Sequence, residues 1–127
     1  RAMDYFNLDV YSRKITTSSP DAQLWFDRGL VWTYSYNHEL AIECFQKATE
    51  YDAQCAMAHW GIAYAVGPNY NFEWWMMDPD TKSSALRTAY DRTHAALALV
   101  DKARLQAEAS LQQANREAEA WKRRVVK

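Results

Sequence analysis

The chain of 127 residues carries 15 Lys and Arg against 16 Asp and Glu, a formal net charge of −1 at pH 7. This balance provides no overall attraction for nucleic acid or for an anionic membrane surface, so neither is expected as a partner. Two cysteines are too few for a disulfide-linked secreted scaffold, and no run approaches the roughly 18 apolar residues of a membrane span. We therefore expect one soluble, cytoplasmic domain with reduced cysteines and no cofactor.

The first part of the chain predicts an extended arm followed by two helices. Residues 1–20 lack a helical period and end in a Thr-Thr-Ser-Ser-Pro cluster, which favours extended or turn backbone. Ser19 before Pro20 is a typical helix start, so a helical domain is expected over 21–100, with its first helix over 22–36. Asn37 ends that helix and can cap a second one that runs to about Tyr51.

A third helix, a loop and a fourth helix complete the predicted domain. Residues 55–66 form an apolar helical pattern that Gly67-Pro68 stops. The following segment, 67–80, is an aromatic loop that must fold back on the domain or face a partner. A fourth helix is expected over 81–100, with one side formed by Leu86, Ala89, Tyr90, Thr93, Ala96, Leu97 and Val100.

The last segment, 101–127, predicts an amphipathic C-terminal helix. Its apolar residues alternate in steps of four and three, as in coiled coils: Ala107, Leu111, Ala114, Ala118, Trp121 and Val125. No Gly or Pro separates this helix from the previous one, but Asp101 can cap a new start. We therefore expect two separate helices, the second of which caps the domain.

An internal repeat with a period of 34 residues relates the two halves of the domain. Ala22 aligns with Ala56, Trp25 with His59, and Gly29 with Ala63. The repeat units are expected over 22–55 and 56–100. Small residues at helix crossings allow close approach while rings fill the gaps, and the predicted repeat core is Trp25, Gly29, Ala41, Phe45, Ala48 and Ala63.

These positions match the tetratricopeptide repeat motif, and the chain resembles the amino-terminal portion of a group of bacterial and fungal tetratricopeptide repeat proteins. The resemblance covers roughly residues 5–100 and is carried by three stretches, SSPDAQLWFDRGL, YNHELAIECF and CAMAHWGIAYAVGPNYN. It implies an all-α solenoid of antiparallel helical hairpins, about two repeats long, whose default role is to bind another protein. The proline that usually ends the first unit is replaced by Ala53.

The resemblance also implies a concave groove lined by the first helix of each unit. The corresponding positions are Gln23, Phe26, Leu30, Thr33 and Tyr34 in the first unit and Met57, Trp60 and Tyr64 in the second, with Tyr70, Trp74 and Trp75 from the aromatic loop beside them. This apolar surface suits an apolar or aromatic segment of a partner. Phe26 and Leu30 stand where carboxylate-binding relatives have Lys and Asn, so carboxylate binding is not expected.

Three alternatives remain open at this stage. The aromatic loop or the C-terminal helix can fill the groove itself, or that helix can form a homodimer. The remaining alternative is a pocket around His38, His59 and Tyr70 that binds a small ligand, a metal or haem and could also be catalytic. Cys55 and His59 share a helix face, but no metal-binding motif fixes four ligands, and a structural role is favoured for His38, Cys55 and His59. No catalytic residue is expected.

Overall fold

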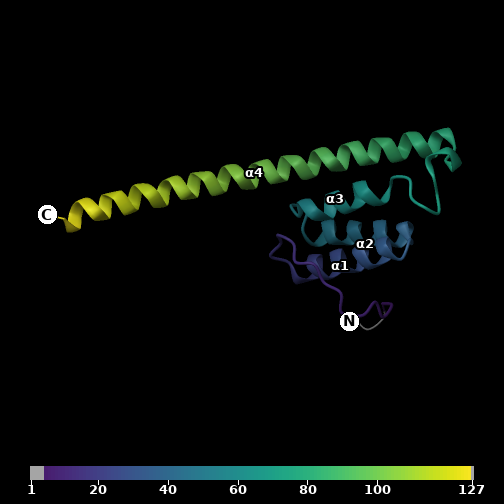
Figure 1. Ribbon diagram of the computed structural model, residues 1–127, viewed down its shortest axis with the longest axis horizontal. Helices are drawn as coiled ribbons and strands as arrows, with labels where there is room; N and C mark the ends of the chain where they lie inside the picture. The colour runs from purple at the N-terminus through teal and green to yellow at the C-terminus, as the bar shows by residue number, and fades with distance from the viewer. Residues whose placement is uncertain (1–4, 127) are drawn as a thin grey trace.

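The computed structural model describes residues 5–126, and this part of the chain is all-helical, as predicted. Residues 1–4 of the predicted arm and Lys127 of the predicted last helix lie outside it. Helices α1 (Pro20–Tyr34), α2 (His38–Tyr51) and α3 (Ala56–Ala65) run antiparallel in successive layers (Figure 1). A 3-10 turn, η2 (Trp74–Met76), then leads into α4 (Pro79–Val125), which lies along α3 and projects far beyond the other helices.

The helix starts are fixed by polar side chains. The Ser19 hydroxyl accepts a hydrogen bond from the Ala22 amide at 3.1 Å, and the side-chain Oδ1 of Asn37 accepts one from the Leu40 amide at 3.1 Å. Asp78 caps α4 by accepting bonds from the amides of Asp80 and Thr81. Each cap satisfies amides that the first turn of a helix leaves unpaired.

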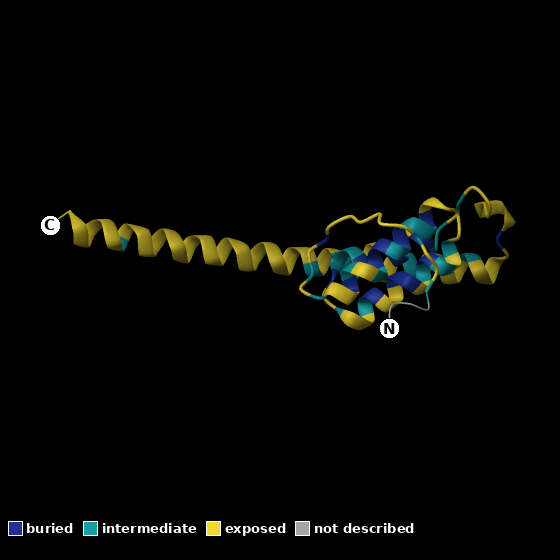
Figure 2. Cartoon of the chain, turned by 90° about the horizontal axis from the view of Figure 1, so that it is seen from below, coloured by how far each residue is buried: buried dark blue, intermediate teal, exposed yellow. Residues whose placement is uncertain are grey.

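Phe45 of α2 lies at the centre of the core, where three helices meet. Its side chain is buried between Gly29 of α1 and Gly61 of α3, and a Cβ on either glycine would lie within 2.6 Å of a ring atom. Phe26 and Ile62 are also buried beside it. Figure 2 shows this core as a buried band within the helical body. The small residues therefore set how closely α1 and α3 approach α2.

The predicted arm is not a free lead-in, because its residues pack on α1. The Ser12 hydroxyl and the Arg13 amide donate to the buried carboxylate of Asp27 at 2.7 and 3.0 Å. Gln23, which was expected to line the groove, instead accepts a hydrogen bond from the Ile15 amide at 3.0 Å and donates to the Arg13 carbonyl at 2.8 Å. Ile15 is thereby buried and joins the core.

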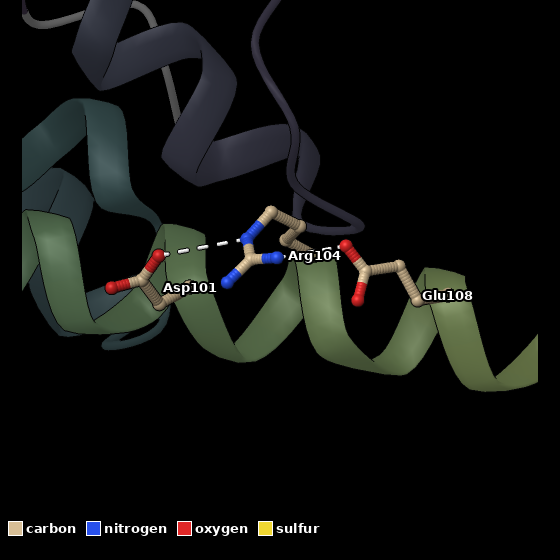
Figure 3. A network of polar contacts seen from close by, with 3 residues as sticks. All are labelled: Asp101, Arg104 and Glu108. Atoms are coloured by element: carbon tan, nitrogen blue, oxygen red, sulfur yellow. Dashed lines mark hydrogen bonds and ion pairs between the residues drawn. The ribbon is translucent and has the colours of Figure 1, made fainter.

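The predicted break at Asp101 is wrong, because α4 is one helix of 47 residues. Asp101 does not cap a new start. Its carboxylate pairs with Arg104, 3.8 Å away, and the Arg104 guanidinium also binds Glu108 at 2.8 Å (Figure 3). Such pairs at spacings of three and four residues support a continuous helix, and the chain has no Gly or Pro here to stop it.

The face of α4 that packs on α3 also differs from the predicted one. Leu86, Tyr90, Leu97 and Val100 are exposed, whereas the half-buried residues are Lys82, Ala85, Thr88, Ala89, Arg92, Ala95, Ala96 and Leu99. The chosen face is rich in alanine and lets the two helices approach closely. The larger apolar residues consequently remain in water on an adjacent face.

Candidate functional site

Part of the predicted groove is buried and is not available to a partner. Phe26 is 0%, Leu30 2% and Thr33 7% exposed, and the Thr33 hydroxyl donates to the Gly29 carbonyl at 2.8 Å. Phe26 and Leu30 belong to the same core cluster as Ile15. The assignment of Phe26 and Leu30 to a binding surface is therefore wrong, because the arm and the neighbouring helices close over this part of α1.

Aromatic residues from three segments instead surround one hollow of 300 Å³ at an end of the helical stack. We call it the tyrosine hollow. Its lining residues are Thr33, Tyr34, Tyr36, His38, Tyr64, Pro68, Asn69 and Tyr70. Tyr34, Tyr64 and Tyr70 are 62%, 57% and 83% exposed, so each residue remains largely in contact with water. The fold brings them together from distant parts of the chain. Of the predicted groove residues, these three and the buried Thr33 converge on this hollow.

Tyr36 is placed by the way α1 ends. Its amide donates to the Thr33 carbonyl and the Asn37 amide donates to the Trp32 carbonyl, the paired bonds of a Schellman motif. In this motif the residue at Tyr36 takes a left-handed backbone, here with φ of 61°. Its ring centroid consequently lies 6.1 Å from that of Tyr70. The sequence interpretation missed Tyr36, since glycine or asparagine usually occupies this position.

Tyr70 is carried by a tight turn in the aromatic loop. The backbones of Asn69 and Phe72 exchange two hydrogen bonds of 3.1 Å, and the Asn69 side chain accepts a third from the Asn71 amide at 2.9 Å. Met77 is the buried residue of this loop, 6% exposed, and fixes its far end. The turn is thus closed at one side and anchored at the other, which presents Tyr70 at its tip.

A larger hollow of 940 Å³ adjoins the tyrosine hollow and shares Tyr36, His38 and Asn69 with it. Within the described part of the chain, the only carboxylates that line it are Glu39 and Asp80, and no Lys or Arg lines it. The Nδ1 atom of His38 is buried here and has no hydrogen-bond partner among residues 5–126. The combined site therefore offers aromatic rings at one side and negative charge with an unused imidazole nitrogen at the other.

The remaining predicted groove residues lie elsewhere. Trp60 stacks on Tyr64, with ring centroids 5.3 Å apart, and so extends the aromatic surface along α3. Met57 packs against the core. Trp74 and Trp75 line neither hollow; Lys82 lies 5.1 Å from the Trp74 ring, and the Trp75 indole donates to Glu73.

The pocket proposed around His38, His59 and Tyr70 is only partly present. His38 and Tyr70 share the tyrosine hollow, but His59 does not line it. The His59 ring lies 2.9 Å from the Ala53 carbonyl through Nε2 and 3.0 Å from Arg92 through Nδ1, so both nitrogens have structural partners. His59 therefore links α3 to α4 and is not a site residue.

A metal centre at these residues finds no support in the geometry. No group of three or more His, Cys, Asp or Glu that could hold a metal ion occurs between residues 5 and 126. Cys55 is completely buried, and burial raises the pKa of its thiol and of the Cys44 thiol. Both thiols are thus held in the protonated form, which is neither a good ligand nor a good nucleophile.

The predicted repeat core occupies the interior only in part. Gly29, Ala41, Phe45 and Ala48 are buried. Ala63 is half-buried, and Trp25 packs on the outside of the core, where Arg28 and Lys47 lie over its ring at 4.5 and 5.1 Å.

None of the helices between residues 5 and 126 combines the length and the apolar character that crossing a membrane requires. Comparisons of the chain with protein-family models, with curated proteins and with solved structures gave no match.

Proposed function

We propose that this chain is a tetratricopeptide-like interaction module that binds an extended segment of another protein at the tyrosine hollow. The observation that carries the proposal is the convergence of Tyr34, Tyr64 and Tyr70 on one hollow while each stays more than half exposed. Aromatic rings in water retain a large unused burial energy, and their hydroxyls add hydrogen-bonding capacity. Such surfaces are typical of binding sites for peptides.

The tetratricopeptide interpretation is supported by the antiparallel order of α1, α2 and α3 and by the period of 34 residues. The ring of Phe45 packed against Gly29 agrees with the large and small residues of that motif. In this interpretation α4 supplies the second helix of the second unit, delayed by the aromatic loop. The hollow then lies at the ends of α1 and α3, the first helices of the two units.

The chemistry of the two adjoining hollows indicates the kind of segment that binds. The tyrosine hollow suits an apolar or aromatic side chain, because ring faces and edges surround it. Glu39 and Asp80 line the larger hollow and leave its charge unbalanced. A Lys or Arg a few residues from the anchor would reach these carboxylates, so the preferred partner carries an apolar or aromatic anchor followed by a basic residue.

A display library of random nonapeptides tests this proposal directly. We expect selection on the unmodified chain to enrich an aromatic or apolar anchor beside Lys or Arg. The Tyr34→Ala, Tyr64→Ala double variant should bind the selected peptides at least about tenfold more weakly, the equivalent of roughly 1.4 kcal/mol. Tyr51→Ala is the matched control, because Tyr51 is 54% exposed and lines neither hollow.

Two outcomes would contradict the proposal. Equal binding of the selected peptides by the double variant and by the control would show that the hollow is not the binding surface. Failure to enrich any peptide on the unmodified chain would remove the peptide-binding function itself.

A second candidate function is the binding of a small polar molecule in the larger hollow, favoured by the unpartnered Nδ1 of His38. A buried imidazole nitrogen without a partner is costly, and a ligand hydroxyl or amine would satisfy it. Thermal unfolding in the presence of a panel of small amines and alcohols tests this idea. A stabilisation that His38→Phe abolishes would support it, and no stabilisation by any compound would refute it.

A further inference from the structure

The second half of α4 has no packing partner within the described part of the chain. Between residues 101 and 125 every residue except Ala120 is exposed, and Figure 2 shows this segment as an exposed rod. Leu111, Trp121 and Val125 are 62%, 61% and 59% exposed. A helix that leaves such side chains in water gains little stability from packing, which is the usual source of helical stability. A covering surface would therefore stabilise this segment.

Apart from Leu105 and Val126, the large apolar residues of this segment fall on one stripe, together with three alanines. Starting from Val100, steps of four and three lead to a seam, which we call the α4 seam, made of Val100, Arg104, Ala107, Leu111, Ala114, Ala118, Trp121 and Val125. This spacing is that of the buried positions of a coiled coil. All seam residues except Arg104 are apolar, so the surface is built for another helix.

We propose that a second copy of this chain covers the α4 seam, with the two α4 helices antiparallel and the two-fold axis between Gln112 and Gln113. In this register the exposed segment 100–125 of one copy lies along the same segment of the other. It brings together Val100 with Val125, Arg104 with Trp121, Ala107 with Ala118, and Leu111 with Ala114 of the second copy. The overlap is about 39 Å long at 1.5 Å per residue, and it leaves the two helical bodies at its outer ends.

The charges favour this orientation over the parallel one. In a parallel pair in register, Arg104 would face Arg104 of the second copy inside the seam, which places two like charges together. In the antiparallel pair Arg104 faces the indole of Trp121, a favourable partner for a guanidinium. Arg104 also keeps its bonds to Asp101 and Glu108, which flank the seam on its own helix (Figure 3).

A second charge pair agrees with the same register. Asp101 and Lys122 occupy equivalent positions beside the seam, and the antiparallel register places each near the other residue of the second copy. Flanking charges of opposite sign set the orientation of coiled coils. The alanines near the centre pair with alanine or leucine, so the two helices can approach closely.

Light scattering and analytical ultracentrifugation of the full chain test the proposal. At high protein concentration we expect twice the mass of one chain, with dissociation on dilution. The Leu111→Lys, Trp121→Lys variant should have the mass of a single chain throughout. Leu105→Lys is the matched control, because Leu105 is 57% exposed but lies off the seam, and it should dimerise like the unmodified chain.

Charge reversal tests the register. Asp101→Lys alone and Lys122→Asp alone should each weaken dimerisation on the order of tenfold, and the double reversal should restore it. Spin labels test the orientation: labels at Gln113→Cys should be close, and labels at Arg123→Cys about 32 Å apart. A mass of one chain at every concentration would overturn the proposal. The proposal would also be overturned if Leu105→Lys lost dimerisation to the same extent as the double variant, or if the double charge reversal failed to restore dimerisation. Short distances between the labels at both positions would overturn it too.

Discussion

The packing of Phe45 between two glycines makes a sharp prediction about Gly61→Ala. An ideal Cβ at position 61 would lie 2.6 Å from the Cδ1 and Cγ atoms of Phe45 and 2.7 Å from Cε1. Favourable carbon contacts occur at about 3.5–4.0 Å, so the overlap is about 1 Å. Phe45 is 1% exposed and its ring centroid lies 5.5 Å from that of Phe26, so the ring has no free space into which to turn.

The size of the effect follows from two opposing contributions. Overpacking a core costs about 1–3 kcal/mol, and the upper end applies here because the added Cβ overlaps three ring atoms of Phe45. Replacing Gly by Ala inside a helix contributes about 1 kcal/mol in the stabilising direction. We therefore expect Gly61→Ala to lower the free energy of unfolding by about 2 kcal/mol. Gly29→Ala should behave alike, since its Cβ would lie 2.5 Å from Cε1 of the same ring.

Urea unfolding followed by circular dichroism measures this change. Gly67→Ala is the matched control: its Cβ would lie 3.6 Å from the Tyr64 carbonyl oxygen, an ordinary contact, so stability should stay equal or rise by up to about 1 kcal/mol. In a Phe45→Leu background, Gly61→Ala should cost at least about 1 kcal/mol less than in the unmodified chain, because the two sites share one contact. Full stability of Gly61→Ala in the unmodified background would refute this account of the core.

Three further predictions concern the arm, the thiols and the loop. Burial, followed by the hydrogen bond to Cys44, raises the pKa of Tyr5 from 10.0 to about 12, so the folded state keeps this proton longer than the unfolded one. The resulting stabilisation is complete below pH 10 and is lost between pH 10 and 12; unfolding measurements should show a shallower fall there for Tyr5→Phe, and an identical fall would contradict it. Cys44 and Cys55 should react with a thiol reagent only as fast as the protein unfolds, and immediate labelling of either at neutral pH would exclude their burial. Met77→Ala should lower stability by about 2–3 kcal/mol and expose the 67–78 loop to proteolysis first, whereas unchanged cleavage would show that Met77 is not the anchor.

The starts of the first two helices could be predicted because a single capping residue marks each of them. Ser19 before Pro20 and Asn37 before His38 act as caps in the structure as the pattern indicates. Asp101 misled because an aspartate can either cap a helix or pair with a basic residue one turn later. Here the carboxylate of Asp101 pairs with Arg104, and the helix continues. The one sequence feature that indicated a continuous helix is the absence of Gly and Pro over 80–126.

The candidate site could be predicted only in part, because the exposure of a helix face depends on which other segments pack against it. Helical spacing assigns Phe26 and Leu30 to a face of α1, but it does not say what covers that face. The cover includes Ile15, which is buried where the arm folds back and is hydrogen-bonded to Gln23. Motif positions named Tyr34 and Tyr64, which the structure places at the tyrosine hollow, whereas Tyr36 depends on a backbone conformation that its residue type seldom takes.

The left-handed backbone of Tyr36 sets the stability of the end of α1 against the presentation of an aromatic ring. A bulky residue in this conformation costs roughly 1–2 kcal/mol that glycine would not incur. Tyr36→Gly should therefore raise the free energy of unfolding by roughly 1–2 kcal/mol, while it removes the ring that lies 6.1 Å from that of Tyr70. The end of α1 thus presents a ring beside Tyr70 at the expense of its own backbone.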